Sequence, residues 1–316
     1  MNIKMAKKIY YDLLEYCIGA KSFKPAPYTR FDLIYPLGLD WALAKGNIEF
    51  SPKDDAGIPM FDSPHHGIYY NPTRVAGYSF AHWNRFVIVG DDHSKSIFLK
   101  CANWFRTVAP EGRLVYSFPL LGMPPNWISA LAQCEAAGIM ALAHHISGEN
   151  DWLQSMRLFL QPVYLAVEHG GILRYFETGE PFLEEYPTVL PNFTLNGNLI
   201  AIACLDLTTQ ITPDKKLEQF ISDLVAGLER HWKRWDTGHW TIYDLSHESK
   251  GGMPNWCTTV YQNIHATMIG YLGHRFKRTI LTETGERWAI FADSLPNRLR
   301  ALKNKSIYRL KNPSEL

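Results

Sequence analysis

The chain has 316 residues, of which 46% are hydrophobic and 20% are charged, and its formal net charge at pH 7 is +1. This balance is typical of a globular protein and excludes both a basic nucleic-acid tail and a polybasic membrane patch. No apolar run approaches the roughly 20 residues that span a bilayer. We therefore expect no membrane span and no nucleic-acid partner.

The first 70 residues are predicted to form an N-terminal helix and an arm. Residues 3–18 carry apolar side chains at helical spacing, but Asp12 and Glu15 interrupt the pattern expected of a signal peptide. Residues 20–70 are rich in proline and glycine, which favours short extended pieces over long elements. We expect a cytoplasmic protein with this arm in front of a larger domain at residues 71–316.

The larger domain is predicted to be mainly helical. Asn71 and Pro72 begin a helix that ends near Val89, since proline suits a first helical turn. Further helices are predicted at about 94–108, 127–145, 150–167, 193–208, 213–235, 256–271, 275–291 and 296–303. Extended stretches are predicted between them at 113–118, 171–176, 182–186 and 240–243.

A Pro-Asn-aromatic tripeptide occurs where extended stretches give way to helices. The copies begin at Pro125, Pro191 and Pro254, so they are 66 and 63 residues apart (125 to 191 and 191 to 254). An asparagine at this point suits a helix N-cap. Repeated helical hairpins, each introduced by a short β piece, predict an (α/α) toroid or incomplete α/α barrel with short β-hairpins at its mouth.

In such a ring the inner helices run parallel, so their N-termini lie at one end. Each N-terminus carries a partial positive charge, which predicts an anionic ligand at that mouth. The segments before the helices bring Glu184, Glu185, Tyr186 and Tyr243 to the same place. Taken singly, these residues also fit a solvated acidic edge and packed aromatic side chains.

Two side chains of the last repeat share one helix face. Tyr261 and His265 are four residues apart, so both point to the same side of the helix. A tyrosine there either packs with its hydroxyl bonded or lines a central pocket. The neighbouring Asp236-Thr237-Gly238 is like an aspartic-protease signature, but it occurs once, in helical surroundings, and we set that interpretation aside.

Metal and cofactor sites are not predicted. The five cysteines are scattered without a Cys-x-x-Cys motif, which argues against a zinc site and a disulfide framework. The pairs His65-His66 and His144-His145 are adjacent, so their side chains diverge on a helix. No clustered metal-ligand spacing and no glycine-rich phosphate loop occur.

At these residues the chain resembles the C-terminal catalytic region of D-glucuronyl C5-epimerases, which convert D-glucuronate to L-iduronate in heparosan or heparan-type polymers. The resemblance is good over about 122–272 and fainter over 69–104. It indicates a short bacterial-type form. The motifs that carry it are Ser129–Gln133, Glu184–Thr188, Leu195–Gly197, Asp236–Gly238, Thr241–Leu245, Pro254-Asn255, Tyr261 and His265.

The resemblance implies a toroid and a set of site residues. The implied catalytic residues are Glu185, Tyr186, Tyr243 and Tyr261. Weaker candidates for substrate binding are Asn196, His265, Arg174 and Trp127. Ser246 stands where the family usually has arginine, Thr259 and Val260 replace Trp-Asp, and His239 stands in a turn of small residues, which puts the substrate in question more than the reaction.

The expected reaction is proton abstraction at C5, α to a carboxylate, and protonation from the opposite face. Tyr261 and Glu185 are the predicted opposed pair, with their faces unassigned, while Tyr186 and Tyr243 hold the carboxylate. The expected partner is an anionic uronate polysaccharide, and the oligomeric state is left open, a homodimer included. Alternatives are a uronate-polysaccharide lyase on the same fold and a non-catalytic glycan-binding protein.

Overall fold

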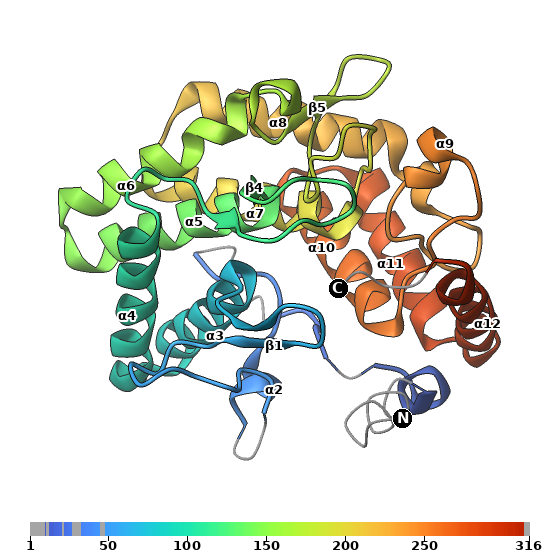
Figure 1. Cartoon of the computed structure of the whole chain (residues 1–316), viewed down its shortest axis with the longest axis horizontal. Helices are drawn as coiled ribbons and strands as arrows, with labels where there is room; N and C mark the ends of the chain where they lie inside the picture. Colours follow the sequence, from blue (N-terminus) through green and yellow to red (C-terminus); the bar gives the residue numbers. More distant parts are fainter. Residues whose placement is uncertain (1–9, 11–12, 21, 27–32, 45–47, 313–316) are drawn as a thin grey trace.

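A computed structural model describes residues 10, 13–20, 22–26, 33–44 and 48–312 (Figure 1). The helices are α2 (Asp40–Leu43), α3 (Pro72–Val89), α4 (Asp92–Val108), α5 (Ala130–Ser147), α6 (Asn150–Leu160), α7 (Leu195–Ile211), α8 (Lys215–His231), α9 (Ser246–Lys250), α10 (Thr259–Arg275), α11 (Thr279–Asp293) and α12 (Leu295–Lys311). The 3₁₀ helices are η1 (Gln161–Tyr164), η2 (Val167–His169) and η3 (Trp232–Trp235). The strands are β1 (Phe61–Ser63), β2 (Gly67–Tyr69), β3 (Val115–Tyr116), β4 (Trp127–Ile128), β5 (Leu173–Tyr175) and β6 (Pro181–Leu183).

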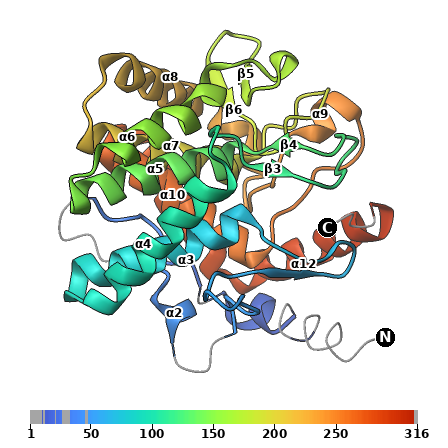
Figure 2. The same cartoon turned by 60° about the vertical axis from the view of Figure 1, so that its left-hand side comes forward.

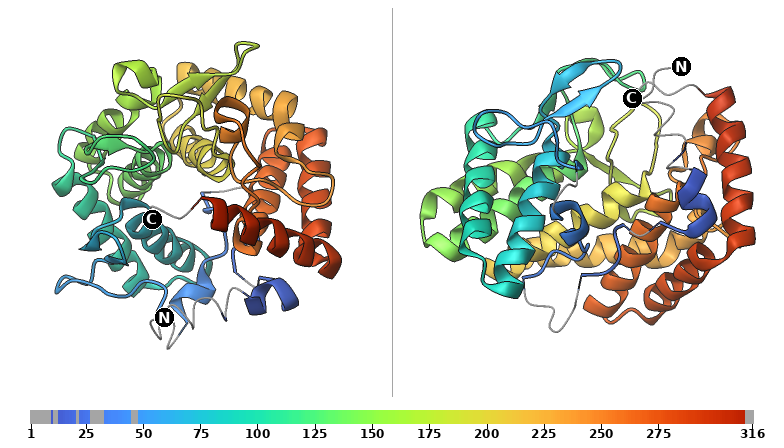
Figure 3. Two further views of the ribbon diagram at one scale, coloured as in Figure 1. Left: turned by 45° about the vertical axis from the view of Figure 1, so that its right-hand side comes forward. Right: turned by 90° about the horizontal axis from the view of Figure 1, so that it is seen from below.

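Helical hairpins form a ring, with α3, α5, α7 and α10 inside and α4, α6, α8 and α11 outside (Figure 3). The inner helices α5 and α7 are apolar on nearly every side and almost wholly buried. The outer helix α8 is apolar along one face, and this face packs inward against the rest of the ring. Inner helices therefore have a wide apolar surface, whereas outer helices have a narrow apolar face.

The short strands form antiparallel pairs. β3 pairs with β4 through Val115 opposite Ile128, and β5 pairs with β6 through Arg174 opposite Phe182. Figure 2 shows these pairs and α9 gathered at the same end of the ring. The stretches predicted at 113–118, 171–176 and 182–186 therefore contain strands, although shorter than predicted, whereas 240–243 forms only isolated bridges.

The described part of the N-terminal arm lies between α3 and α10. On one side, Asn84 of α3 accepts a hydrogen bond from the Tyr35 N–H and donates one to the Tyr35 carbonyl, both at 2.9 Å. On the other side, Asn263 of α10 donates to the Ala20 and Ser22 carbonyls at 2.9 and 3.1 Å. The arm therefore bonds to both helices that flank this part of the ring. Of the predicted first helix, residues 13–18 are helical and the rest lies largely outside the described residues.

The last hairpin of the ring is held by a close helix contact. A Cβ atom at Gly285 of α11 would lie 2.6 Å from the Gly270 Cα of α10. A Cβ at Gly270 would meet its nearest neighbour at an ordinary 3.7 Å. The contact therefore requires glycine at position 285 but leaves room for a Cβ atom at position 270.

None of the helices in the described ranges is long and apolar enough to cross a membrane.

Candidate active site

Backbone hydrogen bonds tie the starts of α5 and α7 to the extended segment of the next repeat. The Ala130 N–H of α5 donates to the Glu184 carbonyl, and the Leu195 N–H of α7 donates to the Tyr243 carbonyl, both at 3.0 Å. The Tyr243 N–H donates to the Asn255 carbonyl at 2.6 Å. These bonds bring the predicted site segments together, but they also occupy helix amides that the sequence argument assigned to an anion.

The predicted asparagine N-caps of the repeat are wrong. The helices begin later, with Ser129, Thr194 and Thr258 at the N-cap positions. Asn192 and Asn255 have other partners: the Asn192 N–H donates to Glu184 Oε1 at 3.0 Å, and Asn255 Nδ2 donates to an Asp244 oxygen at 2.7 Å. The asparagines therefore hold the loops before the helices.

A cavity of about 800 Å³ opens at this end of the ring. Tyr186, Tyr243 and Tyr261 all line it, and we call it the tyrosine cavity. The Tyr186 and Tyr243 hydroxyl oxygens are 3.5 Å apart, and the rings of Tyr243 and Tyr261 meet edge to face with centroids 4.8 Å apart. The structure therefore brings the predicted tyrosines into one cluster.

These phenols stay protonated near neutral pH. Burial at the floor of the cavity raises the pKa of Tyr186, Tyr243 and Tyr261, and the negative charge of Glu185 raises each pKa further. Their hydroxyl groups can donate hydrogen bonds or a proton to a bound molecule. They are not resting phenolate bases.

Glu185 lies behind the tyrosines. Its Oε2 accepts a hydrogen bond from Asn196 Nδ2 at 3.0 Å. Burial raises the pKa of Glu185 to about 7, opposed by hydrogen bonds from Tyr186, Asn196 and Tyr243. Glu185 is 7% exposed and is absent from the described lining of the cavity, so it reaches the cavity through the tyrosines that it bonds.

Gly197 makes room for this carboxyl group. A Cβ atom at Gly197 would lie 2.5 Å from Glu185 Cβ and 2.6 Å from Glu185 Oε2. On the first turn of α7, Asn196, predicted to bind substrate, donates a hydrogen bond to Glu185, and Gly197 leaves space for the Glu185 side chain.

Arg174 also has partners within the protein. Its Nε lies 3.1 Å from Glu184 Oε1, and its Nη2 donates to the Thr188 carbonyl at 2.6 Å. Glu184 also accepts from the Asn192 and Phe193 N–H groups at 3.0 Å. Burial raises the pKa of Glu184, while these amides and Arg174 lower it. In the described residues, Arg174 holds the Glu184 segment and does not line the tyrosine cavity.

Trp127 and His265, two further predicted substrate-binding residues, are buried beside the site. The Trp127 ring stacks on Tyr116 at 4.1 Å and lies 5.9 Å from Tyr186, so it supports that tyrosine. His265 is 0% exposed and its Nδ1 lies 2.9 Å from Thr241 Oγ1. Burial lowers the pKa of His265 to about 3, so the ring is neutral. Neither residue belongs to the described lining of the tyrosine cavity.

A buried carboxyl group near Glu185 was not among the site residues predicted from the sequence. Glu135 of α5 is 3% exposed and, among the described residues, its Oε2 has no hydrogen-bond partner. Burial and the nearby Glu185 raise the pKa of Glu135 well above its ordinary value. The site therefore favours the protonated form of Glu135. An acidic residue in an otherwise alanine-rich inner helix was the signal that could have identified it.

The charged lining of the cavity was also missed. α12 runs to Lys311, whereas the predicted helix ended at Lys303. The lining carries one carboxylate, Asp244, and several basic side chains, namely Lys250, Lys305, Arg309 and Lys311. Positive charge at this mouth therefore comes from side chains, which favours an anionic ligand.

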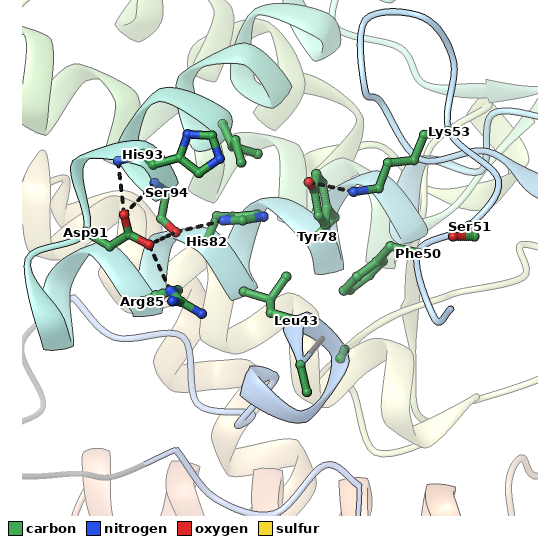
Figure 4. A pocket seen from close by; sticks show the side chains of 13 residues that line it. Leu43, Phe50, Ser51, Lys53, Tyr78, His82, Arg85, Asp91, His93 and Ser94 are labelled. Carbon is green, nitrogen blue, oxygen red and sulfur yellow. Dashed lines mark hydrogen bonds and ion pairs between the residues drawn. The ribbon is translucent and has the colours of Figure 1, made fainter. Parts of the chain in front are cut away.

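A second cavity of about 360 Å³ lies between α3, α4 and the arm and contains none of the predicted site residues (Figure 4). Ser94 Oγ donates to Asp91 Oδ2 and lies 2.9 Å from His82 Nδ1. Because this hydroxyl proton is used by Asp91, His82 Nδ1 is the donor to Ser94. Burial lowers the pKa of His82 to about 4, so its ring is neutral, and it joins α3 to α4 through Ser94 and the Asp91 carboxylate.

Among the described residues, no group of three or more His, Cys, Asp or Glu side chains is placed to hold a metal ion.

Comparison with known proteins gives matches over this same part of the chain. A D-glucuronyl C5-epimerase of Caenorhabditis elegans is 29% identical over 184 residues, which cover 54% of this chain and 30% of that protein. An uncharacterized protein of Methanocaldococcus jannaschii is 22% identical over 180 residues, 56% of each chain. The chain thus spans less than two thirds of the length of either relative.

The fold has a match among solved structures. Cellobiose 2-epimerase from Bacillus thermoamylovorans superimposes with a TM-score of 0.50 at 10% identity, covering 69% of this chain and 58% of that one. This likeness concerns the fold alone and confirms the predicted α/α toroid. The profile of the family described as D-glucuronyl C5-epimerase C-terminus matches residues 113–290. Since that match covers more than half of the sequence, the chain belongs to the D-glucuronyl C5-epimerase C-terminus family.

Proposed function

We propose that the protein is a carbohydrate epimerase that inverts C5 of D-glucuronate residues in a heparosan-like polymer to give L-iduronate. The observation that carries this proposal is the grouping of Glu185 with Tyr186, Tyr243 and Tyr261 at one cavity with a basic rim. Family membership supports the reaction class. The basic rim supports an anionic sugar as the substrate.

Glu185 is the base of the proposed reaction. Its pKa of about 7 leaves a substantial part of this carboxyl ionised at neutral pH, whereas the neighbouring tyrosines are protonated. Only Glu185 in this cluster therefore holds a negative charge that can accept a proton. Because it lies behind Tyr186 and Tyr243, the C5 proton reaches it through one of these hydroxyls, which gives its own proton to Glu185.

Tyr261 is the acid on the opposite face of the sugar ring. The C5–H bond breaks, and its electron pair is held as an enolate of the substrate carboxylate, stabilised by hydrogen bonds from the tyrosine hydroxyls. Tyr261 then donates its O–H proton to the other side of C5. One proton leaves and one arrives, so the sugar changes configuration without a change in composition, and the reverse reaction exchanges the two roles.

Incubation with heparosan in heavy water tests this function. We expect deuterium at C5 and iduronate in a polymer of unchanged length. A lyase would form the same carbanion but would expel the C4 substituent, giving shortened chains with an unsaturated, UV-absorbing end. A binding protein would give neither product, and either of these results would overturn the proposal.

Tyr261→Phe tests the assigned acid. The variant keeps the ring packing against Tyr243 but loses the proton donor, so we expect turnover to be lost while heparosan binding remains. Tyr175→Phe is the matched control, because Tyr175 is 54% exposed on β5. Near-normal turnover in Tyr261→Phe would refute the assignment.

A further inference from the structure

The last helix, α12, follows the region that matches the family and forms one wall of the tyrosine cavity. We infer that Lys305 of this helix binds the carboxylate of the sugar at which the reaction occurs. This inference rests on the proposed function for the identity of the sugar. It assigns the binding group to a helix outside the family match.

Lys305 is fixed in place by the third Pro-Asn repeat. Its Nζ donates to Asn255 Oδ1 at 2.7 Å, and Asn255 Nδ2 donates to Asp244 Oδ2 at 2.7 Å. The backbone carbonyl of the same asparagine accepts from the Tyr243 N–H. A single asparagine therefore sets the position of Lys305 relative to a tyrosine of the cluster.

The ammonium group of Lys305 has capacity for a ligand. It carries three donors, and Asn255 accepts one of them. The hydrogen-bond partner of Lys305 Nζ among the described residues is a neutral amide oxygen, although the side chain is partly buried. Burial lowers the pKa of Lys305, and the charge of the nearby Asp244 offsets this only in part. Burying part of a cation without an ion-pair partner costs free energy, and a bound anionic ligand would offset that cost.

The neighbouring carboxylate does not fill this role. Asp244 accepts hydrogen bonds from the Ser246 N–H and from Asn255. It therefore orients the asparagine that holds the lysine and leaves the lysine donors to the cavity. A carboxylate bound there would have its enolate form stabilised by the same positive charge, because C5 abstraction moves electron density onto the carboxylate oxygens.

The test compares Lys305→Met, Lys305→Arg and the control Lys303→Met, which removes an exposed lysine of the same helix. Binding is measured by calorimetry with a heparosan oligosaccharide and with the same oligosaccharide after reduction of its carboxyl groups to alcohols. We expect Lys305→Met to weaken binding of the acidic oligosaccharide roughly tenfold to a hundredfold, with little change for the reduced one. We expect Lys305→Arg and Lys303→Met to keep the preference for the acidic form.

Circular dichroism and melting temperature show whether each variant is folded, and C5 deuterium exchange is measured in parallel. Equal weakening for both oligosaccharides, or an equal effect of Lys303→Met, would overturn the role of Lys305. So would a wild-type protein that does not distinguish the two. Failure of the wild-type to exchange C5 hydrogen would count against the proposed epimerase instead, because carboxylate binding is measured independently of turnover.

Discussion

Replacing Glu185 by glutamine gives a pH-dependent change in stability whose size follows from the structure. In the unfolded chain the carboxyl has its ordinary pKa of 4.5, and burial raises it to about 7 in the folded protein. A raised pKa means that the folded state holds the proton more tightly. The favourable contribution of the protonated group is complete below pH 4.5 and is lost as pH rises through about 7.

The magnitude follows from linkage at about 1.36 kcal/mol per pKa unit. Glutamine does not titrate, so Glu185→Gln escapes the loss that the wild-type protein suffers. We expect the stability of the variant relative to wild-type to increase by about 2 to 3 kcal/mol between pH 5 and pH 8. The side chain is 7% exposed, so little of this shift is screened by solvent.

Urea unfolding at pH 5, 6, 7 and 8 measures this difference. Glu283→Gln, at an exposed position of α11, is the control and should show no comparable trend. The contribution from Glu184 occurs in both proteins and cancels to first order, whereas that from Glu135 changes because the Glu185 charge raises its pKa. A stability difference between Glu185→Gln and wild-type that stays constant across this pH range would refute the buried, titrating carboxyl on which the assignment of the base depends.

Gly197→Ala should displace Glu185 and reduce C5 exchange at least tenfold, because the new Cβ would lie 2.5 Å from Glu185 Cβ; full activity would contradict this. Gly285→Ala should lower unfolding free energy by roughly 1 to 3 kcal/mol, while Gly270→Ala across the same contact should change it far less; equal effects in thermal unfolding would disprove the one-sided contact. Wild-type exchange should rise with pH around an inflection near 7, as Glu185 ionises, whereas a rate flat from pH 5 to 8 would exclude this base.

The sequence predicted features that depend on local pattern. Helices were predicted at about 127–145 and 193–208, and α5 and α7 occupy nearly these ranges. The proline after Asn71 predicted the start of α3, where the Asn71 side chain accepts from the Thr73 N–H at 3.1 Å. The segments that carry Glu185, Tyr186 and Tyr243 were predicted to meet at the mouth of the ring, because each segment precedes an inner helix.

Features that depend on distant partners could not be predicted. Asn255 looks like a helix cap in isolation, but its side chain bonds Asp244 and Lys305, and the latter is 50 residues away. Arg174 looks like a free substrate-binding cation until its buried partner Glu184 is known. His265 shares a helix face with Tyr261, but the loop at Thr241 covers it. In each case a residue outside the local sequence pattern determines the environment of the side chain.

The contacts between the N-terminal helix and α12 have a consequence for the order in which the chain folds during synthesis. Arg298 of α12 donates to the Tyr16 and Cys17 carbonyls at 2.9 and 3.0 Å, across 282 and 281 residues. These bonds cannot form until α12 has left the ribosome. The early hairpins can pack as they emerge, since their contacts are mostly between sequence neighbours. The segment around Tyr16 and Cys17 must therefore wait for α12, which is synthesised much later, before these bonds can form.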